Sequence, residues 1–130
     1  MTIFQNRKTN TSFINLNKIA AGDVSYQKEL KRLCVELLLN FKNEYKKLAF
    51  DKNIKLLHSL LHKAKFTIFL IGDIYIEKEV AFVINVIEDA NRIYMEIDET
   101  ILLNSTQFID KLIDQYIQKL NHLLGSKLLF

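Results

Sequence analysis

The sequence has no proline, no tryptophan, one cysteine and only three glycines among its 130 residues. So few helix breakers favour long helices over a fold of many short strands. A single cysteine excludes an intrachain disulfide, so we expect a reduced, cytoplasmic protein in which Cys34 is a small buried thiol. Charged residues interrupt every apolar run before about 18 residues, which predicts no membrane-spanning segment.

What the sequence does contain is typical of one globular domain. Hydrophobic residues make up 49% of the chain and charged residues 25%, a composition too apolar for a disordered protein. The net charge is +3, and the lysines are spread along the chain without a basic cluster among aromatics. We therefore expect no nucleic-acid partner.

Apolar residues recur at alternating spacings of three and four, which predicts helices. We expect a flexible arm at 1–12 and one domain at 13–130. Within the domain we expect a short helix at 13–20, long helices at 24–48, 51–72 and 73–94, and a last helix from about 104. Segments 66–72 and 80–87 have strand propensity, but the helical pattern around each persists for about 20 residues, longer than a usual strand. The predicted fold class is all-α, an antiparallel up-and-down four-helix bundle with a short extra N-terminal helix.

The expected helix ends depend on capping residues. Gly22 is expected to end the short helix in a left-handed conformation, and Asp23 to cap the next helix. Asp51 is the expected cap of the third helix, and Asn104 with Gln107 the capping pair of the last.

The helix at 24–48 is predicted to bury one stripe and to expose its lysines. The expected stripe is Tyr26, Leu30, Leu33, Leu37, Phe41, Tyr45 and Leu48. The lysines and arginine expected on the surface are Lys28, Lys31, Arg32, Lys42, Lys46 and Lys47.

The helix at 51–72 carries the residue that best suggests chemistry, His62. Its expected buried stripe is Ile54, Leu57, Leu61, Ala64, Ile68 and Ile71. At about 100° per residue, His62 points roughly 130° away from that stripe. Lys65 lies about one turn further along and Lys63 is adjacent in sequence, which favours an anionic partner.

A metal site at His58 and His62, one turn apart, is the weaker interpretation. A zinc peptidase would carry glutamate after the first histidine, where this chain has Ser59. No nearby cluster supplies further ligands, so we expect no metal.

The order of several motifs resembles the histidine-containing phosphotransfer (HPt) family of two-component phosphorelays. The family hallmark is a helical histidine, a lysine three residues later, a small residue next, and a glycine about ten residues after the histidine. Here these positions read His62, Lys65, Phe66 and Gly72. The similarity extends over about 14–92, and it includes the Gly22-Asp23 pair and Ile87-Glu88.

The resemblance implies a phosphocarrier and not an enzyme in its own right. His62 would accept a phosphoryl group from one receiver-domain aspartate and pass it to another, with Lys65 and Lys63 offsetting its charge. The pKa of free imidazole is about 6.5, so at physiological pH much of it is the neutral form, which is the nucleophile. The expected partners are response-regulator receiver domains and a hybrid histidine kinase. The receiver would supply magnesium, and we expect a monomer without a cofactor. The expected partner-binding residues are Phe66, Ser59, Leu70 and His58.

Phe66 is the departure that matters, because the family usually has a small residue there. By the same angular count Phe66 faces outward, and Leu70 lies near that face. Phe66 is either an apolar docking contact or an obstruction. The second alternative predicts a degenerate helical adaptor that binds a signalling partner without phosphotransfer.

Overall fold

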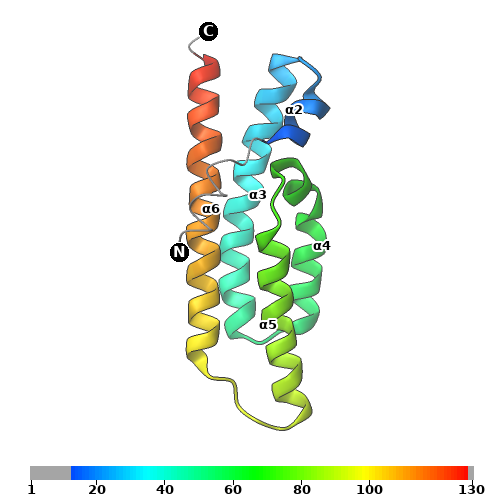
Figure 1. Cartoon of the computed structure of the whole chain (residues 1–130), viewed down its shortest axis with the longest axis vertical. Coiled ribbons are helices and arrows are strands. Elements are labelled where there is room, and N and C mark those ends of the chain that lie inside the picture. Colours follow the sequence, from blue (N-terminus) through cyan, green and yellow to red (C-terminus); the bar gives the residue numbers. More distant parts are fainter. Residues whose placement is uncertain (1–12, 129–130) are drawn as a thin grey trace.

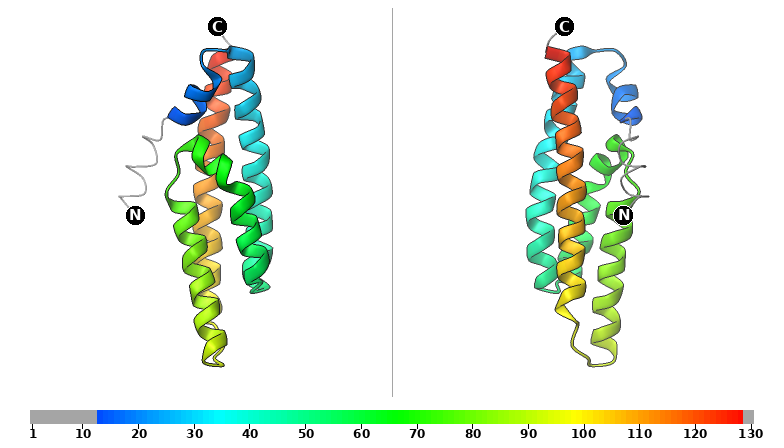
Figure 2. Two further views of the ribbon diagram at one scale, coloured as in Figure 1. Left: turned by 90° about the vertical axis from the view of Figure 1, so that its right-hand side faces the viewer. Right: turned by 60° about the vertical axis from the view of Figure 1, so that its left-hand side comes forward.

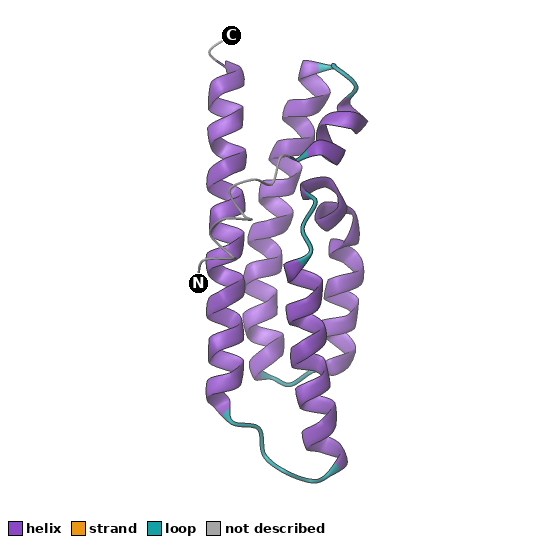
Figure 3. Ribbon diagram, in the orientation of Figure 1, coloured by secondary structure: helices purple, strands orange, loops and turns teal. Residues whose placement is uncertain are grey.

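The computed structural model describes residues 13–128, with the backbone alone for residue 14 and for residues 123–128. These residues form helices and no strand (Figure 3). The helices are α2 (Ile14–Ala20), α3 (Val24–Phe50), α4 (Ile54–Ile71), α5 (Tyr75–Arg92) and α6 (Glu99–Leu128). The helical interpretation of segments 66–72 and 80–87 is confirmed. The arm expected at 1–12 lies outside the described residues.

The long helices α3 to α6 lie side by side, and the short α2 lies at one end of them (Figure 1). Helix α3 packs on α4 and α6, and α5 packs on the same two helices. Helix α2 contacts both α3 and α4, and Figure 2 shows it over the end of α4. One end of α4 is therefore covered, while the outer side of the same helix faces solvent.

The core lies between the long helices and is mainly aliphatic, with two buried tyrosines. The Tyr45 hydroxyl hydrogen-bonds to the Ser105 hydroxyl at 2.6 Å, and the Tyr116 hydroxyl donates to the Asp73 carboxyl group. Burial of these phenols without such partners would be costly. Other fully buried side chains are Leu16, Leu57, Leu70, Ile71, Ile76, Ile87, Leu102 and Ile109.

The buried face of α3 is rotated from the predicted stripe. Tyr26, Leu33 and Leu37 are exposed, whereas Cys34 and Leu38 are buried. The expected stripe is therefore wrong at Tyr26, Leu33 and Leu37. It is confirmed at its other four positions, Leu30, Phe41, Tyr45 and Leu48. The helix carries leucines on several faces, and its contacts with both α4 and α6 decide which of them are covered.

Lys31 is also buried, with 2% of its surface exposed, so its expected place on the surface is wrong. It follows Leu30 and lies three residues before Cys34, on the covered side of α3. A lysine can occupy such a position because its aliphatic stem packs like an apolar side chain.

The caps at the junction between α2 and α3 agree only in part with those expected from the sequence. Asp23 caps α3 as expected, and its side chain accepts a hydrogen bond from the backbone N–H of Tyr26 at 3.0 Å. The left-handed residue that ends α2 is Ala21, with φ of 51°, and Gly22 follows with φ of 83°. The chain thus makes this turn with two successive residues of positive φ.

Two other expected helix starts are wrong. Asn53, and not Asp51, caps α4, since its side chain accepts from the Leu56 backbone N–H at 3.0 Å. Asp51 instead lies at the C-terminal end of α3.

Helix α6 begins at Glu99, well before the expected Asn104. Asp98 accepts from both the backbone N–H and the hydroxyl of Thr100, at 2.9 and 2.6 Å. An aspartate immediately before the helix therefore satisfies the first free donors.

Candidate functional site

Helix α4 is a well-defined platform for the side chains along it. Asn53 caps its start, and Gly72 ends it with φ of 69°, the left-handed conformation that glycine adopts without strain. One face packs against α3 and α5. The buried residues of α4 are Leu57, Leu60, Thr67, Ile68, Leu70 and Ile71.

His62 lies on the opposite, solvent-facing side of α4 and is exposed, as its spacing predicts. Lys65, about one turn further along, is exposed too, as are His58 and Ser59 on the preceding turn. At about 100° per residue, these side chains share a broad outer face of the helix with the His62 ring. An anion that approaches this face meets an imidazole and the ammonium of Lys65.

Two phenylalanines share the outer face with His62. Phe66 is 51% exposed, as predicted, and Phe69 is 52% exposed. Phe69 was missed in the sequence, where it reads as one more apolar residue of segment 66–72. Its spacing of seven from His62 was the available signal, because residues seven apart on a helix point the same way.

Leu70 does not belong to this face, so its expected outward position is wrong. It is 1% exposed. Helix α2 packs against α4, and the Asn15 side chain donates to the carbonyl of the preceding residue, Phe69, at 2.8 Å. Leu70 cannot contact a partner in this conformation.

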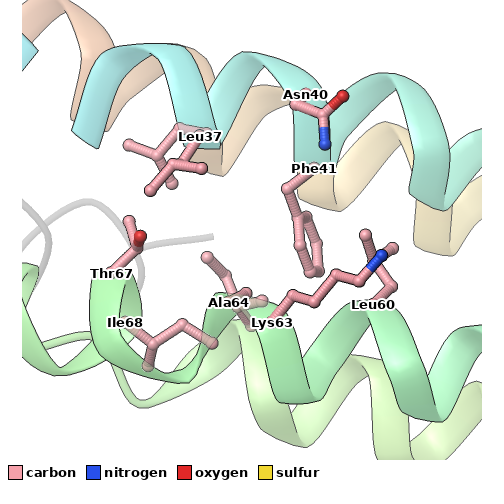
Figure 4. A pocket seen from close by; sticks show the side chains of 10 residues that line it. Leu37, Asn40, Phe41, Leu60, Lys63, Ala64, Thr67 and Ile68 are labelled. Carbon is pink, nitrogen blue, oxygen red and sulfur yellow. The ribbon is translucent and has the colours of Figure 1, made fainter. Parts of the chain in front are cut away.

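Lys63 is exposed, but it lies on a different side of α4 from His62. Together with Leu37 of α3 and Ala64 of α4 it lines a cavity between these helices, and Figure 4 shows its side chain along the edge of that cavity. Because successive helical residues diverge by about 100°, its ammonium group and the His62 ring leave α4 in different directions. Lys65 is therefore the lysine that shares a face with His62.

The other chemical candidates have simple structural roles or no cluster around them. Cys34 is buried, and burial raises the pKa of its thiol to about 11, so it is a poor nucleophile at neutral pH. Across the described part of the chain, no three His, Cys, Asp or Glu side chains are grouped to hold a metal ion.

The described helices also contain no stretch that combines the length and apolar character needed to cross a bilayer.

The chain was compared with known protein families, with curated proteins and with solved structures, and it matches none of them.

Proposed function

We propose that this protein is a phosphocarrier of the histidine phosphotransfer type, with His62 as the residue that accepts the phosphoryl group. The observation that supports the proposal is the exposure of His62 on the outer face of a packed helix. A ring held out in this way can approach a phosphorylated aspartate in the pocket of another protein. Lys65 lies on the same face and offsets negative charge on the transferring group.

We further propose that α3 to α6 form the antiparallel up-and-down four-helix bundle to which the resemblance points. Figure 1 supports this arrangement, since the connections between the long helices lie at alternating ends. The bundle buries one face of α4 and leaves its other face to a partner.

In the proposed reaction, a neutral nitrogen of the His62 ring attacks the phosphorus of a receiver's aspartyl phosphate. The N–P bond forms as the P–O bond to the aspartate breaks, the carboxylate leaves, and the ring retains the phosphoryl group as a phosphoramidate. Transfer to a second receiver reverses these bonds. Each receiver supplies the acidic pocket and the magnesium, so this chain contributes the nucleophile and a cationic neighbour.

Phe66 and Phe69 favour a second candidate, an adaptor that binds a signalling partner without transfer. Both rings are about half exposed beside His62, and exposed aromatic side chains of this kind are typical anchors of protein interfaces. The same rings also serve a working phosphocarrier as docking contacts, so the two candidates differ only in the chemistry.

The test is a transfer assay with purified receiver domains from the same genome, each labelled with radioactive acetyl phosphate. The wild-type chain is expected to acquire label that is lost in acid and retained in alkali, as a phosphoramidate is. His62→Gln is expected to lose at least about 99% of this transfer, because no other ring nitrogen replaces the nucleophile. His58→Gln is the matched control, since it changes an exposed histidine one turn away, and it should transfer normally.

Circular dichroism and thermal melting check that both variants fold like the wild type. Label that persists on His62→Gln would refute the assignment of His62. Receiver binding without transfer by the wild type would favour the adaptor, and transfer gained by Phe66→Ala would show that the Phe66 ring obstructs His62.

A further inference from the structure

The connection between α5 and α6 begins with three successive exposed apolar residues. Ile93, Tyr94 and Met95 are 55%, 97% and 64% exposed. Figures 1 and 2 show the end of α5 and this connection extending past the turn between α3 and α4. Single apolar side chains on a surface are common, but three together at a projecting end form a patch that a partner can bind.

Tyr94 occupies a backbone position that glycine would fill without strain. Its φ is 58°. Its N–H donates to the Asn91 carbonyl at 3.4 Å, and the N–H of Met95 donates to the Ala90 carbonyl at 2.9 Å. This pattern ends many helices, usually with glycine at the left-handed position, and α4 ends in the same way with Gly72. The tyrosine therefore costs stability, and its ring is almost fully exposed to other molecules.

The residues around this ring are acidic. Residues 88–99, the acidic tip, carry five carboxylates and one arginine, a net charge of −4 in a chain whose net charge is +3. Arg92 pairs with Asp89 at 2.8 Å, and Lys52 lies 3.6 Å from Glu99. Glu96, next to Met95, is exposed. A surface that fits the acidic tip combines positive charge with exposed apolar groups.

The outer face of α4 is such a surface. Segment 52–72 contains four lysines and two histidines but neither aspartate nor glutamate. Lys55 is exposed and precedes His62 by seven residues, so it points the same way as His62 and Lys65 extends the charge along the helix. Phe66 and Phe69 on this face are half-exposed. The face therefore complements the acidic tip in charge and shares its aromatic character.

Charge also decides which pair of surfaces can meet. Two acidic tips repel each other, and so do two outer faces of α4, because each surface carries charge mainly of one sign. Only a tip against a face brings opposite charges together. Within one chain the helices hold the tip beyond the start of α4 (Figure 1), so the contact joins two copies.

We propose that the acidic tip of one copy of this chain docks on the outer face of α4 of a second copy. Tyr94 packs against Phe66 and Phe69, and the carboxylates of the tip lie near Lys55 and Lys65. The contact is head-to-tail and covers the face that carries His62, so a docked copy is closed to other proteins there. The inference concerns the unmodified chain and does not depend on phosphoryl transfer.

The test is sedimentation of the purified full chain up to a concentration of about 1 mM, which detects a weak contact. The average mass is expected to rise with concentration at about 50 mM salt and to rise much less at about 500 mM salt, because salt screens exposed charges.

Tyr94→Gly separates binding from stability. It should weaken the association by about tenfold or more and raise the Tm by roughly 2–5 °C, because it removes the ring and relieves the left-handed backbone. Lys52→Gly is the matched control. Lys52 has φ of 56° and ends α3 with the same hydrogen-bonding pattern. Its replacement should also raise the Tm but leave the association unchanged.

A mixture of two variants tests which surfaces meet. Lys65→Glu reverses a charge on the outer face and leaves the tip intact, whereas Tyr94→Gly leaves the face intact. Each variant alone should remain monomeric at concentrations where the wild type associates. An equimolar mixture should form a 1:1 pair, because one chain supplies the tip and the other supplies the face.

Three results would overturn the proposal: a wild-type chain that stays monomeric at the highest concentration, an undiminished association in Tyr94→Gly, and a mixture of the two variants that forms no pair. Helical circular dichroism confirms that each variant is folded. The outcome is distinct from that of the transfer assay, since His62→Gln leaves the charged and aromatic residues of both surfaces in place and should associate like the wild type.

Discussion

The Asp73 carboxyl group connects the start of α5 to α6. Replacing it tests how much this connection contributes to the free energy of unfolding. One oxygen accepts from the backbone N–H groups of Tyr75 and Ile76 at 3.0 and 2.6 Å, and the other accepts from the Tyr116 hydroxyl. The residue is 8% exposed. Burial, followed by the neighbouring Asp73 charge, raises the pKa of Tyr116, so its hydroxyl keeps the proton that it donates.

Asp73→Ala removes both roles of this side chain. Loss of the helix cap costs about 0.5–2 kcal/mol, and loss of the hydrogen bond between the carboxyl group and Tyr116 about 1.5–3 kcal/mol. We therefore expect the free energy of unfolding to fall by about 2–5 kcal/mol. For a domain of this length that corresponds to a decrease in Tm of roughly 8–20 °C.

The assay is a double-mutant cycle in urea with Asp73→Ala, Tyr116→Phe and the combined variant. Because both single variants break the same hydrogen bond, the combined loss should fall short of their sum by about 1 kcal/mol or more. Asp73→Asn, which keeps the cap, should lose less than Asp73→Ala. Additivity within about 0.5 kcal/mol would refute the claim that this contact couples α5 to α6.

Two further predictions concern the cap of α4 and the buried thiol. Asn53→Ala should lower the free energy of unfolding by about 1 kcal/mol, because the Asn53 side chain accepts a hydrogen bond from the first turn of α4. Asp51→Ala should lower it by much less, and urea melts of the two variants measure the difference. Burial raises the pKa of Cys34 to about 11, so the unfolded thiol ionises first as pH rises. The stability difference between wild type and Cys34→Ala should therefore be constant below about pH 8 and decrease toward pH 11, and a difference that stays constant would contradict this.

The helices could be predicted because their signal is local and long. The pattern persists over about 20 residues in α4 and in α5, which outweighs the strand propensity of β-branched residues such as Ile84 and Val86. Helix starts were harder to predict, because several side chains near each start are suitable caps. Asp51 and Asn53 both qualify by type, and only the backbone path after Phe50 selects Asn53.

The rotation of a helix about its axis is a tertiary property where apolar residues cover more than one face. Helix α3 has leucines on several sides, and its neighbours decide that Leu38 is buried and Leu37 is not. Helix α4 has a clearer polar side, so the outward positions of His62 and Phe66 could be predicted. Leu70 could not be placed from α4 alone, because α2, from another part of the sequence, also packs against α4.

The Thr67 hydroxyl could not have been predicted from the sequence, because the absence of a partner is a property of the surroundings. A threonine in a helix often bonds to the carbonyl of the preceding turn, and at position 106 the same side chain does reach a carbonyl. At position 67 the buried Oγ1 has no hydrogen-bond partner, and the residue lines the groove between α3 and α4. Helix α4 thus presents His62 to solvent and Thr67 to the groove beside α3. Since these two sides share no polar contact among the described residues, substitutions on one should leave the chemistry of the other unchanged.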